Sequence, residues 1–197
     1  MPTLTRVRVG RRCALNRRRL PAAGLALLFL PQPAPGQEHG ADPIVLDGYF
    51  QAVAEFFDVP RAEIDILHDW NLPPDEIPVA LFVAERAGVS AEAAVAIWRE
   101  GVDWSGILER YGIGVESLHL PLPQGTAAGA LARVYSELEG TPVKDWEEVE
   151  LTADEVVAFV NLRLIAGVSG GEFEEALLLS AGDMSFVEIY AILLGLG

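Results

Sequence analysis

The sequence predicts an all-α protein in which an array of short helical hairpins packs into one domain. Three features of the 197-residue chain favour this fold. Apolar residues recur at spacings of three and four, as they do on one face of a helix. Residues that cap helices precede many of these runs, and glycine or proline follows them. Few segments alternate apolar and polar residues over the length of a strand.

The first predicted helix spans residues 43–57. Its wide apolar stripe is formed by Ile44, Val45, Tyr49, Phe50, Val53, Phe56 and Phe57. Asp58-Val59-Pro60 ends this helix and begins a second one over 60–70, because proline is tolerated in a first helical turn. A third helix is predicted over 75–87, and Gly88 follows it as a left-handed stop.

Two short helices and an irregular connector come next. Ser90 is expected to cap a helix that runs to Glu100, and Asp103 to cap another over 104–111. Each of these helices is followed directly by a glycine. Residues 113–126 contain prolines and glycines, which predict an irregular connector between two halves of the domain.

The second half is predicted to contain a helix near 127–138 and then three more. Each of the last three begins at a capping box, in which a Ser or Thr and a Glu three residues later exchange hydrogen bonds with the backbone. The three boxes are Thr152–Glu155, Ser169–Glu172 and Ser185–Glu188.

An internal repeat relates residues 75–113 to residues 154–197. Asp75-Glu76-Ile77 aligns with Asp154-Glu155-Val156, and the alignment continues without a gap up to Ser90 and Ser169. The unit is a helix, a tight turn and a second helix. Such a pair cannot bury both of its faces alone, so the copies should stack into one core. We expect the following aromatic residues in that core: Phe82, Trp98, Trp104, Phe159 and Phe186.

Residues 1–36 have the pattern of a secretory signal peptide. They contain seven arginines and no acidic residue, followed by a short apolar run over 22–30 and a proline-rich stretch that ends at Gly36. The alternative is a short anchor helix, but the run is well below the ~20 residues that span a bilayer. The prediction is therefore a signal at 1–36, a flexible lead-in at 37–42 and a single domain at 43–197. Paired arginines loosely fit a twin-arginine signal, although a Sec signal fits better, and either route gives a periplasmic or secreted protein.

The charge of the chain excludes several classes of function. The formal net charge is −15, and without residues 1–36 the chain has 7 basic and 29 acidic residues, a charge of −22. A helix-turn-helix of this charge would be repelled by nucleic-acid phosphates, so no nucleic-acid partner is expected. The single cysteine, Cys13, lies in the leader, which excludes an internal disulfide framework.

No catalytic constellation emerges from the motifs. The histidines His39, His68 and His119 lack metal-ligand spacing, so a metal pair of His68 and His119 would depend on the fold. The carboxylate pairs at 75–76 and 154–155 stand at helix starts, where they complement the helix dipole. The acidic run offers weak candidate ligands for a hard cation such as calcium: Asp145, Glu147, Glu148 and Glu150. This run lacks the spacing of a calcium loop, and a solvated acidic face is the simpler interpretation.

Several segments resemble a family of small, exported, uncharacterised bacterial all-helical proteins. The resemblance rests on Phe57-Asp58-Val59-Pro60, the run from Asp75 to Phe82, the run from Gly101 to Ile107, Lys144-Asp145-Trp146 and Asp154-Glu155-Val156-Val157. It covers most of residues 48–190. The resemblance implies a fold of repeated helix-turn-helix-like pairs, and it implies no catalytic residue and no cofactor.

These observations favour a non-enzymatic, exported helical module that binds a protein or peptide at the cell envelope. No stable membrane span is expected after cleavage of the signal. An alternative is an exported module that binds a small ligand or calcium through the acidic 145–155 region. A further alternative is a hydrolase of envelope polymers, which would require a cleft holding two carboxylates of raised pKa.

Overall fold

The computed structural model describes residues 42–123, 125–168 and 173–196, all within a compact unit that spans His39–Gly197. In these residues there are nine α-helices and no strand, which confirms the all-α prediction. The α-helices are α1 (Pro43–Phe57), α2 (Arg61–Asp69), α3 (Ile77–Ala87), α4 (Ala91–Arg99), α5 (Trp104–Tyr111), α6 (Ala132–Gly140), α7 (Ala153–Val168), α8 (Phe173–Leu179) and α9 (Phe186–Leu193). Short 3₁₀ helices are η1 (Pro74–Glu76), η2 (Val115–Ser117), η3 (Gly129–Leu131) and η4 (Val143–Glu148).

The predicted signal peptide at 1–36 and the lead-in up to residue 41 lie outside the described residues. The same holds for the capping box at 169–172, whose residues precede α8.

The capping residues fix several helix ends as their sequence suggests. Ser90 accepts a hydrogen bond from the backbone of Ala93, and Asp103 accepts one from Gly106. The box at Ser185 is complete, with both reciprocal bonds to Glu188 present. Gly88 follows α3 in the left-handed conformation at φ 65°. Local chemistry therefore sets the bounds of these helices.

Three expectations need correction. The helix predicted over 75–87 begins as the 3₁₀ turn η1, because Pro78 lacks the N–H that a regular α-helical bond to Pro74 requires. The helix predicted near 127–138 begins later, as η3 and then α6, because Gly129 has φ 54° and interrupts regular helix. Trp98 is half-buried rather than in the core, since it lies in the last turn of α4 next to exposed residues. The other four aromatic residues predicted in the core are buried: Phe82, Trp104, Phe159 and Phe186.

Helices α3 and α7 form the centre of the core. In α7 apolar residues on nearly every side are buried, including Phe159, Leu162 and Ile165, as expected of a helix enclosed by others. Seven consecutive residues of α3, from Ile77 to Val83, are also buried. The two helices pack against each other, and burial of this apolar surface is the main source of stability.

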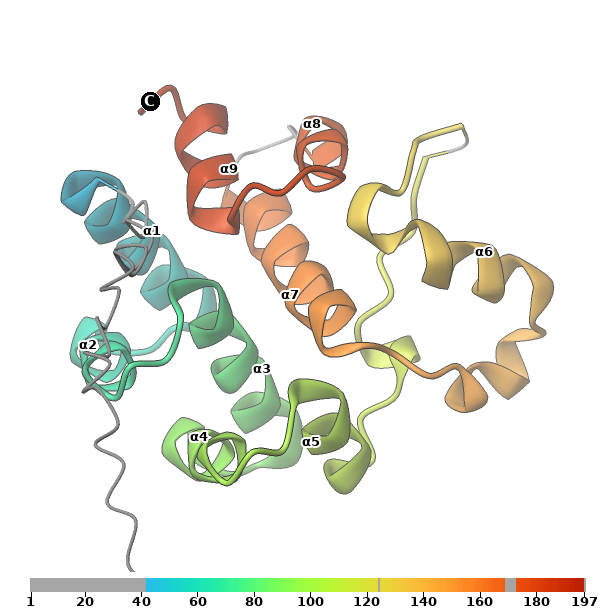
Figure 1. Cartoon of the computed structure of the whole chain (residues 1–197), viewed down its shortest axis with the longest axis horizontal. Coiled ribbons are helices and arrows are strands. Elements are labelled where there is room, and N and C mark those ends of the chain that lie inside the picture. The colour runs from blue at the N-terminus through green and yellow to red at the C-terminus, as the bar shows by residue number, and fades with distance from the viewer. Residues whose placement is uncertain (1–41, 124, 169–172, 197) are drawn as a thin grey trace, which may run out of the picture. The chain divides into compact units, whose positions relative to one another are not determined.

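The remaining helices surround this pair (Figure 1). Helices α4 and α5 lie at the lower end of α3 in the view, α8 and α9 lie near the upper end of α7, and α6 lies to the right. Helix α1 packs against α2, α7 and α9, so the first and last helices of the described domain are neighbours. Each segment of the predicted repeat contains three successive α-helices, which are α3, α4 and α5 in the first segment and α7, α8 and α9 in the second. The repeat itself stays a prediction.

No helix in the part of the chain that the structure describes has both the length and the apolar character needed to cross a membrane.

Candidate functional site

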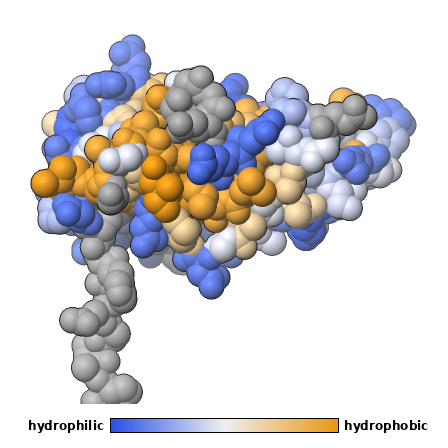
Figure 2. All heavy atoms as spheres, turned by 90° about the horizontal axis from the view of Figure 1, so that it is seen from above, coloured by the Kyte–Doolittle hydropathy of each residue, from blue (hydrophilic) through white to orange (hydrophobic). Residues whose placement is uncertain are grey.

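Exposed apolar side chains gather over α1, α8 and α9 (Figure 2). Five large apolar residues of these helices and of the turn after α9 are exposed: Ile44, Leu178, Ile192, Leu194 and Leu196. We call this set the apolar face. Its most exposed members are Ile44, at 78%, and Leu178, at 62%. Because α1 and α8 both pack against α9, the face is formed by adjoining elements. A gathering of exposed apolar side chains is typical of an interaction surface.

Acidic side chains accompany the apolar face on the same helices. Glu174 and Glu175 precede Leu178 by one helical turn on α8, and both are exposed. Residues three or four apart lie on the same side of a helix, so these carboxylates border the apolar residue. Glu188 stands in the same relation to Ile192 on α9. The face is therefore apolar with an anionic border.

Cationic side chains lie on other elements. None of α1, α8 and α9 contains a Lys or Arg. Arg61 of α2 reaches the α1 border, where its guanidinium lies 2.9 Å from the Asp47 carboxylate. No ion pair to a cation is found for Glu174, Glu175 or Glu188 among the described residues. The carboxylates of Glu174 and Glu175 on α8 are thus available to a partner, whereas Glu188 on α9 already accepts two hydrogen bonds from Ser185 through one of its oxygens.

A buried polar network ties α1 to α7 and η1. The Tyr49 hydroxyl of α1 donates a hydrogen bond to Asn161 Oδ1 of α7. The Asn161 amide nitrogen donates to the carbonyl oxygens of Asp75 and Val157, at 2.7 and 2.8 Å. Both side chains are fully buried, and burial raises the pKa of Tyr49 well above 10.0. A satisfied polar network of this kind fixes one arrangement of the helices.

The Asp75 carboxylate caps a helix far along the chain. Its oxygens accept hydrogen bonds from the backbone N–H groups of Phe186 and Val187, at 2.9 and 3.2 Å. The negative charge also complements the positive end of the α9 dipole. Asp75 stands in the first turn of η1, the helix start at which the sequence places it, and its carboxylate caps α9 in addition.

A pocket of about 380 Å³ lies between α7 and the start of α9. The carboxylates of Asp75, Asp154 and Asp183 contribute to its wall, together with Met184 and Phe186. Burial raises the pKa of Asp75, and the two N–H groups of α9 offset part of this rise.

Glu76 does not line that pocket and has a separate partner. Burial raises the pKa of Glu76, while the hydrogen bond that it accepts from Trp104 Nε1, at 2.6 Å, works in the opposite direction. Its carboxylate thus fastens η1 to α5. Of the pair Asp75 and Glu76, only Asp75 lines the pocket, where it accompanies Asp154 and Asp183, and the hydrolase hypothesis stays a prediction.

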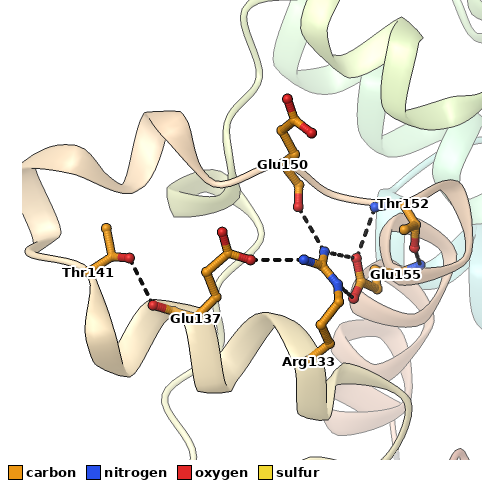
Figure 3. Close-up of polar contacts among 6 residues, drawn as sticks. All are labelled: Arg133, Glu137, Thr141, Glu150, Thr152 and Glu155. Carbon is orange, nitrogen blue, oxygen red and sulfur yellow. Dashed lines mark hydrogen bonds and ion pairs between the residues drawn. The ribbon is translucent and has the colours of Figure 1, made fainter.

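Arg133 organises the polar contacts between α6 and the start of α7 (Figure 3). Its guanidinium donates to both carboxylate oxygens of Glu155, with the Nε bond at 2.7 Å. The same group donates to the carbonyl oxygen of Glu150 and pairs with Glu137, both at 2.8 Å. Glu155 also completes the predicted capping box with Thr152. Burial acts to raise the pKa of Glu155, but the bonds from Arg133 and Thr152 outweigh it and lower that pKa.

The acidic stretch before α7 does not converge on a cation site in the described residues. Asp145 lies 3.4 Å from the ammonium group of Lys144, and Glu147, Glu148 and Glu150 have exposed side chains. In the described ranges, no three His, Cys, Asp or Glu residues lie close enough together to hold a metal ion. The calcium hypothesis therefore stays a prediction from the sequence alone.

The two histidines of the domain have separate aromatic partners. His68 is exposed at the end of α2, and its ring lies 5.0 Å from that of Phe50. His119 lies between the rings of Tyr135 and Trp146, at centroid distances of 5.6 and 4.7 Å. Burial lowers the pKa of His119, which favours the neutral ring. Each histidine therefore contacts aromatic rings of its own surroundings.

Sequence reasoning missed the apolar face and the cap on α9. The face could have been noticed from Ile192, Leu194 and Leu196, because α9 and the turn after it carry apolar residues on more sides than one buried stripe needs. The pairing of Asp75 with Phe186 leaves no local signal, since the two residues are brought together only by tertiary packing.

Comparisons with known proteins give no relative for this chain: no protein-family model, no curated protein and no solved structure matches it.

Proposed function

We propose that the protein is an exported helical module that binds another protein or peptide at the cell envelope and performs no catalysis itself. The observation that carries this proposal is the apolar face on α1, α8 and α9, with Ile44 and Leu178 more than half exposed. Exposed apolar side chains that gather on one face favour association, because a partner removes them from water.

The construction of the face also supports a binding role. The buried bond from Tyr49 to Asn161 ties α1 to α7, and the bond from α9 to Asp75 ties α9 to η1, so two of the three helices under the face are anchored by polar contacts. A face that is rigid before binding loses little conformational entropy when a partner docks. Binding through side chains on preorganised helices therefore requires no rearrangement of the domain.

The binding role is tested by capture from an envelope fraction with matched variants. Leu178→Ser and Ile192→Ser each remove one apolar side chain from the face, on different helices. Val143→Ser is the control, since Val143 is 72% exposed on η4. We expect a partner that is retained by the wild type and by Val143→Ser and lost with both face variants. Equal recovery with all four proteins would exclude the apolar face as the binding surface.

Export is tested on the native protein by cell fractionation and intact-mass measurement. The basic and apolar pattern of residues 1–36 supports a cleaved signal. We expect the protein outside the cytoplasm, with a mass that corresponds to a chain beginning at Gln37. A protein that is found in the cytoplasm and still carries residues 1–36 would contradict the export part of the proposal.

A further inference from the structure

We propose that the partner segment bound at the apolar face is a cationic amphipathic helix. This inference rests on the proposed function and specifies the chemical class of the partner. The carrying observation is the repeated spacing of apolar and acidic side chains on the exposed sides of α1, α8 and α9.

On each of the three helices an exposed apolar residue and a carboxylate lie three or four residues apart, although their order on α1 is reversed. Leu178 follows Glu174 by four residues, Ile192 follows Glu188 by four, and Ile44 precedes Asp47 by three. All six side chains are exposed. Since residues three or four apart share one side of a helix, each helix presents an apolar residue and a carboxylate together.

A partner helix with the complementary pattern matches these groups. Leucine or isoleucine residues on its inner face would contact the apolar face, and lysine or arginine residues one turn away would meet the border carboxylates. The apolar contacts supply most of the affinity, while the charge pairs select the partner and its orientation. Neither feature alone would distinguish this partner from other apolar or basic segments.

The sign of the border disfavours the two other occupants. A second copy would place its own glutamates on α8 and α9 against those of the first, and like charges across an interface are repulsive. An anionic bilayer surface attracts basic rather than acidic segments. Helices α1, α8 and α9 contribute no Lys or Arg that would offset either repulsion, and Arg61 of α2 offsets only the charge of Asp47.

The direct test is binding of a defined peptide probe. The probe is a fluorescent Leu/Lys peptide of about 14 residues, about 21 Å as a helix, with its leucines on one helical face. A scrambled peptide of the same composition, without that face, measures plain charge attraction to an acidic protein. The protein is used as the cell produces it, and fluorescence anisotropy reports the affinity. We expect the amphipathic probe to bind at least about tenfold more tightly than the scramble.

Matched variants separate the face from the overall charge. Glu174→Gln/Glu175→Gln removes two carboxylates at the border, and Glu147→Gln/Glu148→Gln removes two exposed carboxylates on η4. Both changes alter the net charge equally. We expect the border variant to weaken probe binding about three- to tenfold and the η4 variant to change it less than about twofold. Leu178→Ser should also weaken binding, whereas Val143→Ser should not.

Several results would overturn the inference. These are equal affinity for probe and scramble, equal effects of the two glutamine variants, or self-association that Leu178→Ser abolishes. Binding to anionic lipid vesicles that depends on Leu178 would likewise replace a protein partner by a membrane. If an envelope partner is captured through Leu178 while the probe fails to bind, the inference fails and the proposed function stands. If no envelope partner is captured and the probe does not bind, the inference and the proposed function both fail.

Discussion

Asp75 and Phe186 are 111 residues apart, yet the Asp75 carboxylate accepts a hydrogen bond from the Phe186 backbone N–H at 2.9 Å. A residue of η1, the turn before α3, thereby caps α9. The contact joins the two segments of the predicted repeat at the start of α9, a helix that contributes to the apolar face. It also explains why an aspartate is tolerated at a largely buried position, because buried carboxylates need hydrogen-bond donors.

Asp75→Asn is expected to lower the free energy of unfolding by about 1–3 kcal/mol, because the amide brings a buried N–H₂ group in place of an accepting oxygen. Asp154 is aligned with Asp75 in the predicted repeat but is exposed. Asp154→Asn should therefore change stability by less than about 0.5 kcal/mol. Urea denaturation of both variants checks the difference, and equal effects would show that the bond to α9 is not the cause.

The free energy of unfolding should depend on pH in part through the titration of Asp75. Burial raises its pKa in the folded protein above the ordinary value of 3.8. The folded state therefore binds more protons in the window above pH 3.8. The stability that Asp75 contributes in this way is fully present below pH 3.8. It is lost as the pH rises through the pKa that Asp75 has in the folded protein.

Wild type should thus gain stability relative to Asp75→Asn when the pH falls from 7 towards 4. Comparison with this variant cancels the opposite contribution of Glu155, whose lowered pKa gives stability that is lost as pH falls below about 4.5. Unfolding measured across this range checks the prediction. Parallel pH profiles for the two proteins would contradict it.

Arg133→Ala is expected to lower the free energy of unfolding by about 1–3 kcal/mol. The Glu155 side chain is 7% exposed and would lose its two charge-assisted hydrogen bonds. Arg133→Lys should recover only part of the loss, since an ammonium group cannot reproduce the two-pronged contact. Glu137→Gln is the control on the exposed side, with an expected cost of at most about 1 kcal/mol. Full recovery of stability by Arg133→Lys would instead show that the charge of residue 133 matters and its geometry does not.

Two glycine substitutions should change stability in opposite directions. A Cβ at Gly129 would overlap the Leu177 carbonyl oxygen, and the residue has positive φ, so Gly129→Ala should cost about 2–4 kcal/mol. Gly140 ends α6 with no neighbour in the way, so Gly140→Ala should gain about 0.4–1 kcal/mol. Thermal unfolding of the two variants gives the answer, and a tolerated alanine at position 129 would argue against close contact between η3 and α8.

Calcium distinguishes the main proposal from the alternative at residues 145–155. Lys144 already lies beside Asp145, and Glu147 and Glu148 are exposed. We expect no shift of the unfolding midpoint with millimolar calcium, since a ligand raises stability only when it binds the folded state. A rise that Glu147→Gln/Glu148→Gln removes would instead support the calcium hypothesis.

Features that depend on neighbouring residues were predictable. The bounds of α1 follow from its stripe and from Asp58, and the caps Ser90 and Asp103 act within three residues of themselves. These signals are local, so the sequence displays them directly. The all-α class follows from them and from the apolar spacing.

Features that depend on tertiary packing were not predictable. The place of Gly129 against α8, the half-exposure of Trp98 and the ion pair of Arg133 with Glu155 all require knowledge of which helices adjoin. The apolar face belongs to this group, because spacing shows that a residue is apolar without showing whether another helix covers it. The acidic residues of the border were visible in the sequence, but the sequence did not show that exposed apolar residues of other helices lie beside them.

The partnership of α1 with late parts of the chain has a kinetic consequence. Tyr49 needs Asn161, and the Gly48 carbonyl oxygen accepts a hydrogen bond from the Tyr190 hydroxyl, 142 residues later. During synthesis, α1 therefore emerges long before its partners and cannot complete its packing until α9 has left the ribosome. Contacts of such long sequence separation also slow folding. The last helix therefore acts as the closing element of the fold, because the packing of α1 is complete only once α9 is in place.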